Sequence, residues 1–530
     1  MFDIIIKNGT IIDGTGQSMF LGDIGIKEKK INSIGDLQNE KAEKIIDARG
    51  RYVAPGFIDI NNHSDTYWRI FPDPDLESLI YQGVTTILGG NCGSSLAPLV
   101  NKNIIQSIQK WTDIRGLNLN WLKVGEFLQE VEKKKLSVNF ATLVGHGTLR
   151  RGFVGDEARS LTLEEIGAMK KMLKNAMKEG SFGLSTGLVY THGKLASENE
   201  IEELAGTVKD CGGVYVTHIR GEGKELLKSV KEAIRIAQTT KVKLQISHLK
   251  AMGKKNWRLM QKAIDLVEEA KVKGIDVSFD IYPYTETGSV LYTLLPDWVA
   301  EGGKKMMIHR LKDRETRFKV INEMQEDGFD YSKVIISISP LNRILSRKKI
   351  VDIAEAQGKS VEETIIEILI AGEGRVVTIM DVLSKENVIK GIQSPYSMIA
   401  SNGSGYNLNH RNSGELIHPR NFGTFPRLLG QYVREQKILT WEEAIKKISG
   451  LPAEKFGFKK RGTIAKGNFA DIAIFDPEKI DDLATVENPY QYSEGISWVL
   501  VNGKVILENG KYNGVRAGEV LRKDSRFLGL

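Results

Sequence analysis

Cysteine is scarce in this chain, in which only Cys92 and Cys211 occur among 530 residues. A framework of several disulfides, on which many small secreted domains depend, is therefore excluded. A reducing compartment, most simply the cytoplasm, is the expected location. Each cysteine remains available as a small buried residue or as a thiolate ligand for a metal ion.

Long apolar runs are also absent. No stretch reaches the about 18 apolar residues that indicate a membrane-spanning helix, so we expect no membrane partner. Residues 1–9 have no basic region followed by a long apolar stretch, and they predict a strand and a turn instead of a signal peptide.

The chain has little excess charge of either sign. It holds 74 basic and 67 acidic residues, a net charge of +7, which is weak for this length. Lysines and acids lie close together in helical stretches such as 130–135, a pattern typical of a solvated helix face. We therefore expect a small-molecule substrate and no nucleic-acid partner. The oligomeric state is not indicated.

The two ends of the chain resemble each other. Residues 4–12 and 498–506 each place an Asn-Gly pair between two β-rich runs. This is a strong hairpin signal, because both turn residues tolerate positive φ. The similarity predicts one small β-sandwich built from both termini, residues 1–54 and 455–530.

Between the ends, β-rich runs alternate with helical patterns, and 41% hydrophobic residues supply a large core. The β-rich runs are 57–61, 84–88, 138–144, 181–186, 214–217, 242–247, 275–282 and 396–401. Eight such strands predict an α/β fold, a metal-dependent (β/α)8 TIM-type barrel over residues 55–454. The interval 285–395 is too long for one repeat, and it predicts an inserted lid subdomain over the barrel mouth.

Three possible metal ligands follow predicted strands. Cys92 lies in Gly-Gly-Asn-Cys-Gly-Ser-Ser, His218 ends Gly-Val-Tyr-Val-Thr-His, and His248 ends Leu-Gln-Ile-Ser-His. Each alone is more simply a buried structural residue. Together they predict one metal site, because a barrel of this kind builds its active site at the C-terminal ends of its strands. A thiolate and two imidazoles favour one tightly bound zinc ion, with a fourth position for a water whose pKa falls to about 7.

Two further polar residues follow the first predicted barrel strand. His63 could ligate the same metal, border a second, weaker site or orient the substrate, and its simplest alternative is a supporting position behind the ligands. Asp65, two residues on, could accept a proton or hold a ligand in place.

With these residues in view, the chain resembles the amidohydrolase superfamily, and within it the N-acyl-D-amino-acid deacylase (D-aminoacylase) family. The resemblance extends nearly from end to end. Besides the segment around Cys92, the matching motifs are 55–59, 182–188, 217–220, 245–248, 280–284, 418–427 and 461–467. The resemblance implies a β-sandwich and a metal-dependent barrel, with Cys92, His218 and His248 holding the tightly bound metal.

The same resemblance places Lys250 and Tyr282 near the substrate. A cation there suits a carboxylate, and a phenol suits an oxyanion. Arg220 is a further candidate for substrate binding, although Lys250 and Arg220 could equally be solvated charges at the rim. Arg420 is a weaker candidate for binding a carboxylate.

The chain departs from the family in two places. The family has His-X-His after the first strand, where this chain has Asn61-Asn62-His63, and it has Ser-Asp-Gly after the eighth, where this chain has Ser401-Asn402-Gly403. The resemblance assigns that aspartate as the general base. An asparagine amide cannot accept and return a proton in that way.

The predicted function is metal-dependent amide hydrolysis, most simply of N-acyl-D-amino acids, in which metal-bound hydroxide attacks the acyl carbonyl. Asn402 occupies the catalytic position, and Asp65 is the available substitute for its proton transfer. One alternative is a cyclic-amide hydrolase of the hydantoinase or dihydroorotase type, against which Cys92 and the segment 418–420 argue. Another is a catalytically weakened binding protein on the same scaffold.

Overall fold

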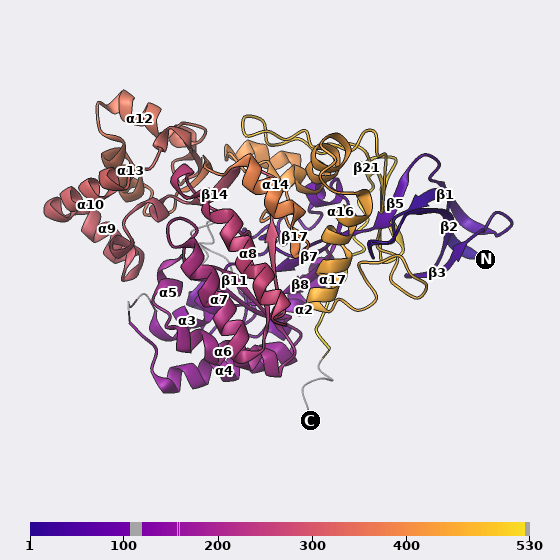
Figure 1. Ribbon diagram of the computed structural model, residues 1–530, viewed down its shortest axis with the longest axis horizontal. Helices are drawn as coiled ribbons and strands as arrows, with labels where there is room; N and C mark the ends of the chain where they lie inside the picture. The colour runs from indigo at the N-terminus through magenta and orange to yellow at the C-terminus, as the bar shows by residue number, and fades with distance from the viewer. Residues whose placement is uncertain (106–118, 156, 158, 525–530) are drawn as a thin grey trace.

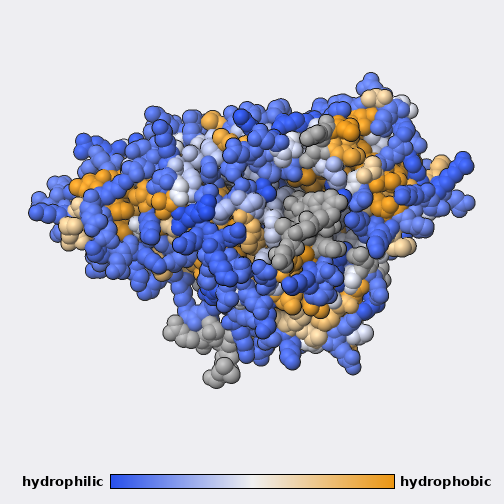
Figure 2. Space-filling model, turned by 180° about the vertical axis from the view of Figure 1, so that it is seen from behind, coloured by the Kyte–Doolittle hydropathy of each residue, from blue (hydrophilic) through white to orange (hydrophobic). Residues whose placement is uncertain are grey.

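The computed structural model describes residues 1–105, 119–155, 157 and 159–524. Along its long axis lie a sheet built by the two terminal segments, a barrel in the middle and an inserted subdomain at the far end (Figure 1). None of the helices in the described ranges is long and apolar enough to cross a membrane. The face in Figure 2 is predominantly hydrophilic, and its hydrophobic residues gather in separate areas.

The terminal segments form one nine-stranded sheet. Its order is β21-β20-β19-β18-β5-β1-β2-β3, and β4 pairs with β1. The two halves join where β5 runs antiparallel to β18, with Tyr52 opposite Phe475 and Pro55 opposite Ile472. Apolar side chains from both halves pack into a core of their own. The strands are β1 (Phe2–Ile11), β2 (Phe20–Lys27), β3 (Lys30–Gly35), β4 (Ala42–Asp47), β5 (Tyr52–Pro55), β18 (Ile472–Phe475), β19 (Ile496–Val501), β20 (Lys504–Glu508) and β21 (Lys511–Tyr512).

The Asn-Gly pair of the C-terminal half is the predicted hairpin turn. Asn502 and Gly503 connect β19 to β20, where Val501 pairs with Lys504. Their φ values are 49° and 75°, which a two-residue turn of this kind requires.

The hairpin predicted at the first Asn-Gly pair is wrong. Strand β1 continues through Asn8 and Gly9 to Ile11, and its pairing with β2 shifts at that point. The Asn8 backbone N–H donates to Asp23 Oδ1 at 2.9 Å, so the positive φ of Asn8 serves a β-bulge instead of a turn.

Eight parallel strand positions form the barrel, so the predicted (β/α)8 fold is confirmed. Its ladders are β6-β7-β8 and β9-β10-β11-β12-β13-β17. Strands β8 and β9 share one position interrupted at Leu143, whose N–H donates to the Gly89 carbonyl at 3.0 Å. Asn62 bridges to Gly403, which closes the barrel between its first and last strands. The strands are β6 (Phe57–Asp59), β7 (Val84–Gly89), β8 (Asn139–Thr142), β9 (Val144–Gly145), β10 (Gly183–Gly187), β11 (Val214–His218), β12 (Lys243–Ile246), β13 (Val277–Ile281) and β17 (Ser397–Ile399).

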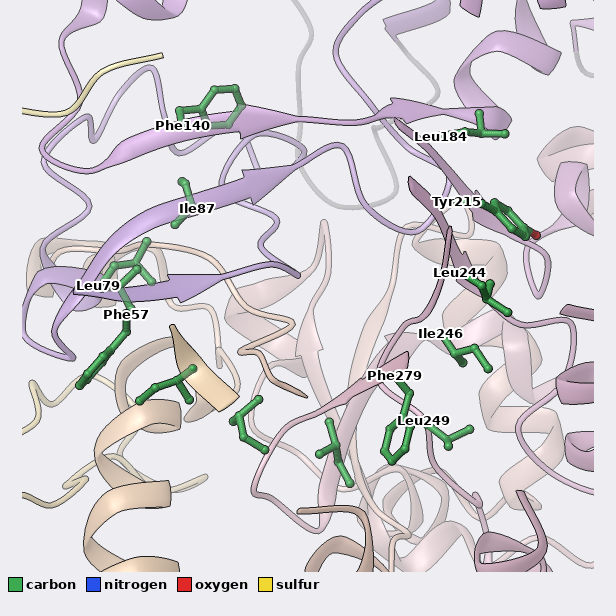
Figure 3. Packing of buried hydrophobic residues seen from close by; sticks show 14 of the residues in the cluster. Phe57, Leu79, Ile87, Phe140, Leu184, Tyr215, Leu244, Ile246, Leu249 and Phe279 are labelled. Atoms are coloured by element: carbon green, nitrogen blue, oxygen red, sulfur yellow. The ribbon is translucent and has the colours of Figure 1, made fainter. Parts of the chain in front are cut away.

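Helices cover the barrel because strand side chains alternate between its interior and its outer face. Ile87 packs in the layer between strands and helices, and the next residue, Leu88, packs inside the barrel. Figure 3 shows this outer layer, to which successive strands contribute apolar side chains. The covering helices include α2 (Val124–Lys134), α4 (Leu163–Lys178), α6 (Glu198–Asp210), α7 (Leu226–Thr240), α8 (Leu259–Val272), α14 (Lys385–Gln393) and α16 (Trp441–Ile448).

The segment between β13 and α14 has its own sheet and its own core. Strands β14, β16 and β15 form an antiparallel sheet in that order. Buried side chains such as Val299, Leu311 and Ile366 form a cluster separate from that of the barrel. Helix α14 contacts α8, β13 and β17 and lies in the ring around the barrel. The main elements are β14 (Glu286–Val290), α9 (Gly303–Lys312), α10 (Arg314–Asp327), β15 (Val334–Ile338), α12 (Ile350–Gln357), α13 (Val361–Ala371) and β16 (Val377–Asp381).

Asp59, at the end of β6, ties the first barrel strand to the last. It is fully buried. Its Oδ1 accepts the Ser401 backbone N–H at 2.9 Å, and its Oδ2 accepts from the side chains of Asn62 at 2.8 Å and of Ser401. Ser401 follows β17, the last barrel strand. The first and last strands share an isolated backbone bridge between Asn62 and Gly403, and the Asp59 carboxylate adds side-chain hydrogen bonds at the same place.

We expect Asp59→Ala to lower the free energy of unfolding by about 2–4 kcal/mol, because it leaves buried donors of Ser401 and Asn62 without an acceptor. Asp59→Asn keeps one acceptor oxygen and should lose less. Denaturant unfolding of the three proteins measures both effects. An alanine variant as stable as the parent would contradict the role of Asp59 in barrel closure.

Candidate metal centre

Cys92, His218 and His248 come together at the C-terminal ends of barrel strands. Cys92 follows β7, His218 is the last residue of β11, and His248 follows β12. Their ligand atoms all lie within 4.8 Å of one another, and Cys92 Sγ is 3.5 Å from His248 Nε2. All three side chains are buried. A thiolate and two imidazoles at this spacing fit a metal ion that keeps one position open.

A tight turn aims Cys92 at the other two ligands. Gly90, Cys92 and Gly93 have φ values of 74°, 52° and 75°. A side chain at Gly90 would overlap the Leu143 carbonyl, and a Cβ at Gly93 would lie 2.6 Å from the Gly187 nitrogen. Close backbone approach therefore requires both glycines, and the main chain fixes the direction of the thiol.

Asp65 lies behind this turn, among residues that do not line the cavity at the metal centre. Its Oδ2 accepts the Gly90 N–H at 2.7 Å, and its Oδ1 accepts the Thr66 N–H at 2.8 Å. The side chain is fully buried, and burial raises its pKa to about 7. Of its two expected roles, the geometry supports holding the Cys92 loop and does not support proton transfer to a substrate.

His63 and Asn402 face each other across the closure of the barrel. His63 Nε2 lies 2.8 Å from Asn402 Oδ1 and 3.9 Å from Cys92 Sγ, and both residues line the cavity with the three ligands. The amide oxygen can only accept, so Nε2 carries a proton in this arrangement. A role of His63 Nε2 as a fourth ligand would therefore require its contact with Asn402 to break.

Asn61 supports His248 indirectly and does not line the cavity. Its Nδ2 donates to Asp280 Oδ1 at 3.1 Å, and the same oxygen accepts the His248 backbone N–H at 2.9 Å. Gln245 Nε2 donates to the other oxygen of Asp280 at 3.0 Å. An aspartate with these donors fixes the backbone that carries His248.

Glu222 belongs to the site, although the sequence analysis did not identify it. Its Oε1 lies 3.2 Å from His248 Nδ1 and 3.5 Å from His218 Nε2, and it forms an ion pair with Lys250. Lys250 Nζ also lies 2.9 Å from His248 Nδ1, so Glu222 and Lys250 together border this nitrogen and fix the ring orientation, while Nε2 faces Cys92. The available signal was its position four residues after His218.

The charges around Glu222 set the protonation states of the site. Burial opposes ionisation of Glu222, but the charges of Lys250 and His218 and the histidine hydrogen bonds hold its pKa well below the ordinary value. Burial, reinforced by the charge of Lys250, lowers the pKa of His248 well below its ordinary value. His248 is therefore neutral, as a metal ligand must be.

Lys250, Arg420 and Tyr282 lie at the cavity or directly beside it. Lys250 lines the cavity and is bound to Glu222. Arg420 also lines it, is only 6% exposed, and has no hydrogen-bond partner for Nη1 among the described residues. The Arg420 guanidinium lies 5.0 Å from the centre of the Tyr282 ring, and the Tyr282 hydroxyl donates to Thr287 Oγ1 at 2.9 Å.

Arg220 is not among the residues that line the cavity with the metal ligands, and its contacts favour a structural role over the expected substrate binding. Its guanidinium binds both carboxylate oxygens of Glu232, with contacts of 2.7 to 3.2 Å. It also donates to the carbonyls of Gly193, Lys194 and Ala196. These bonds connect α7 to the end of α5 (Thr191–Lys194) and to Ala196 just after it, so the charge of Arg220 is used structurally.

The insertion contributes one wall of the cavity. Thr287, Gly288 and Ser289 of β14 line it together with the barrel residues. Gly288 lies against Arg420, because a Cβ there would be 3.5 Å from Arg420 Nη2. The insertion therefore reaches the active face of the barrel beside the residue best placed to bind an anion.

Asp65 gives the metal-free protein a defined pH dependence. Its folded pKa of about 7 exceeds the about 3.9 of an unfolded aspartate. The folded state therefore holds a proton that the unfolded chain releases, so this contribution to stability is complete below pH about 4 and lost as pH rises through about 7.

We expect the melting temperature of the metal-free protein to fall between pH 5 and pH 8, and to fall less in Asp65→Asn, which keeps an acceptor for the Gly90 N–H. Thermal unfolding at matched ionic strength measures both slopes. Equal slopes for the two proteins would contradict the raised pKa.

Comparisons with known proteins agree with this geometry. The chain matches the amidohydrolase family over residues 44–368 and 400–507. It is 33% identical to D-aminoacylase of Alcaligenes xylosoxydans xylosoxydans, with 98% of each chain covered. It is 30% identical to N-acyl-D-glutamate deacylase of the same organism, over 99% of this chain and 98% of the relative.

Solved structures give the same relationship. A D-aminoacylase structure matches with a TM-score of 0.84 at 33% identity, covering 99% of this chain and 100% of the other. N-acyl-D-glutamate deacylase of Bordetella bronchiseptica, complexed with zinc and a phosphonate inhibitor, matches with a TM-score of 0.83 at 30% identity, covering 98% and 100%. L-hydantoinase of Arthrobacter aurescens, at 16% identity and a TM-score of 0.56 over 99% and 100%, shares the fold alone. The prediction from the sequence motifs is confirmed: this chain belongs to the amidohydrolase family, as a metal-dependent hydrolase of carbon–nitrogen bonds other than peptide bonds.

Proposed function

We propose that this chain is a zinc-dependent deacylase of N-acyl-D-amino acids, which releases a D-amino acid and a carboxylic acid. The observation that carries the proposal is the buried cluster of Cys92, His218 and His248, which faces a cavity also lined by Arg420. Similarity to D-aminoacylase and N-acyl-D-glutamate deacylase over nearly the whole chain supports the substrate class.

The three ligands suit zinc. A cysteine thiolate favours zinc over harder divalent ions, and two neutral imidazoles complete a set that leaves one position open. When bound there, the ion would supply a Lewis acid for the acyl carbonyl and for a water molecule. Glu222 and Asp65 hold His248 and the Cys92 loop in place for that ion.

Arg420 is the residue best suited to the substrate carboxylate. It is a buried cation at the cavity, and its Nη1 lacks a hydrogen-bond partner in the described part of the chain. A carboxylate would satisfy that donor through a charge-assisted bond. Lys250 already binds Glu222. Arg420 is therefore the preferred carboxylate-binding residue, although the sequence favoured Lys250. Tyr282 supports Arg420 through its ring, and its hydroxyl is directed to Thr287.

Proton transfer is the step that these residues support least. Asn402 cannot exchange a proton, Asp65 lies behind the Cys92 loop, and Glu222 is paired with Lys250. The proposal therefore includes slow turnover by the unmodified chain.

Replacement of Cys92 tests the metal site and the activity together. We expect Cys92→Ala to lose most bound zinc and hydrolysis, because two imidazoles remain from a three-ligand site. Cys211→Ala is the matched control, since Cys211 is a buried cysteine at the end of α6 and outside the cavity. Elemental analysis should give about one zinc ion per parent chain.

Release of D-amino acids from an N-acetyl-D-amino acid panel, with the L-enantiomers beside them, measures the activity. Full zinc retention by Cys92→Ala would overturn the ligand set. Zinc-loaded parent protein that binds these compounds and hydrolyses none of them would favour the binding-protein alternative.

Asn402→Asp tests the missing proton transfer. A carboxylate there would still accept a hydrogen bond from His63 Nε2, now at 2.8 Å from the amide oxygen, and would add a group that exchanges protons with the substrate. General acid–base catalysis contributes about 10²- to 10⁴-fold, so kcat should rise by that order. The peptide containing Asn402-Gly403 should be checked by mass spectrometry, because deamidation of Asn-Gly creates the same carboxylate. A variant with normal zinc content and no gain in kcat would contradict the assignment of Asn402.

A further inference from the structure

A second, larger cavity opens from the metal centre toward the insertion. It has a volume of about 370 Å³, and Cys92 and Tyr190 line both it and the cavity that holds the metal ligands. A substrate with its scissile bond near Cys92 therefore has room to extend a substituent into this second cavity.

The second cavity is strongly basic. Its described lining includes Arg151, Lys304, Lys305 and Arg375, and contains no aspartate or glutamate. This composition contrasts with the chain as a whole, in which 74 basic residues face 67 acidic ones. A concave surface with charges of one sign attracts a ligand of the opposite sign.

The basic residues come from both sides of the contact between barrel and insertion. Arg151 belongs to α3 (His146–Val154) of the barrel, Lys304 and Lys305 lie in the first turn of α9, and Arg375 precedes β16. The two sides are held together beside the cavity, where Lys194 of α5 forms an ion pair with Asp297 of the insertion. Figure 1 places α3, α5 and α9 in this region.

Arg375 is the most informative of these cations. Its side chain is 13% exposed, and its Nη2 contacts Glu373 Oε2 at 3.1 Å. Its Nε is buried and has no hydrogen-bond partner among the described residues. A buried guanidinium donor without an acceptor is unfavourable, and an anionic oxygen in the cavity would satisfy it.

We propose that the second cavity is a subsite for a second carboxylate on the substrate, so that the preferred substrates are N-acyl-D-amino acids with two anionic groups. This inference rests on the proposed deacylase function. Arg420 would bind the carboxylate next to the scissile amide, and Lys305 and Arg375 would bind the distal one. The distal carboxylate can belong to a dicarboxylic acyl group or to an acidic amino-acid side chain.

Two matched substrate pairs separate these sources. N-succinyl-D-leucine against N-valeryl-D-leucine changes the charge of the acyl group, and N-acetyl-D-glutamate against N-acetyl-D-glutamine changes that of the side chain. We expect kcat/KM of the zinc-loaded protein to favour the dianion by about tenfold or more in one pair, the range of a charge-assisted hydrogen bond. The preference should shrink as sodium chloride rises, because salt screens the attraction.

Charge variants assign the preference to the cavity. Lys305→Glu and Arg375→Met should each lower the dianion-to-neutral ratio. Lys312→Glu, an exposed position at the far end of α9, is the matched control and should keep the ratio of the parent. Loss of preference in Lys312→Glu as well would mean that the attraction comes from overall charge and would overturn the subsite.

The experiment distinguishes failure of the subsite from failure of the deacylase proposal. Hydrolysis of the neutral compounds with no preference in either pair overturns the subsite and leaves the deacylase intact. If no compound is hydrolysed, binding of the same four compounds to the zinc-loaded protein is measured by calorimetry. Equal affinities within both pairs then overturn the subsite, and a dianion preference that Lys305→Glu removes supports it.

Discussion

Buried aspartates that accept backbone N–H groups are the interaction on which the metal site depends. Asp65 binds the turn that carries Cys92, Asp280 binds the backbone of His248, and Asp59 binds Ser401 just before Asn402. In each case a carboxylate holds the backbone of a loop at the C-terminal end of a barrel strand. These bonds fix the backbone positions from which the Cys92 and His248 side chains extend.

The barrel and its ligands could be predicted from the sequence because their signals are local. Each barrel strand is a short apolar run, and Cys92, His218 and His248 stand directly at the ends of such runs. The family motifs gave the same assignment independently. The Asn-Gly turn at Asn502 followed from its own two residues.

The errors and omissions share a different origin, since each depends on a partner far away in the sequence. Asn8 forms a bulge because the Asp23 carboxylate accepts a hydrogen bond from its backbone N–H. Arg220 lies outside the cavity lining, where Glu232 and three carbonyls bind its guanidinium. Glu222 belongs to the site because it contacts Lys250, His218 and His248. The folded barrel brings these residues together. Apart from the four-residue spacing of His218 and Glu222, no sequence period or motif encodes these contacts.

The pairing of β5 with β18 has a consequence for how the chain folds. Strands β1 to β5 are synthesised before the barrel, yet the pairing partner of Pro55, Ile472, is made only after the barrel and its insertion. Contacts of such large sequence separation form late and slowly. The apolar face of the N-terminal strands therefore lacks its C-terminal packing partners while the barrel and its insertion are translated. During that interval the edge of β5 that pairs with β18 is open to association with other chains.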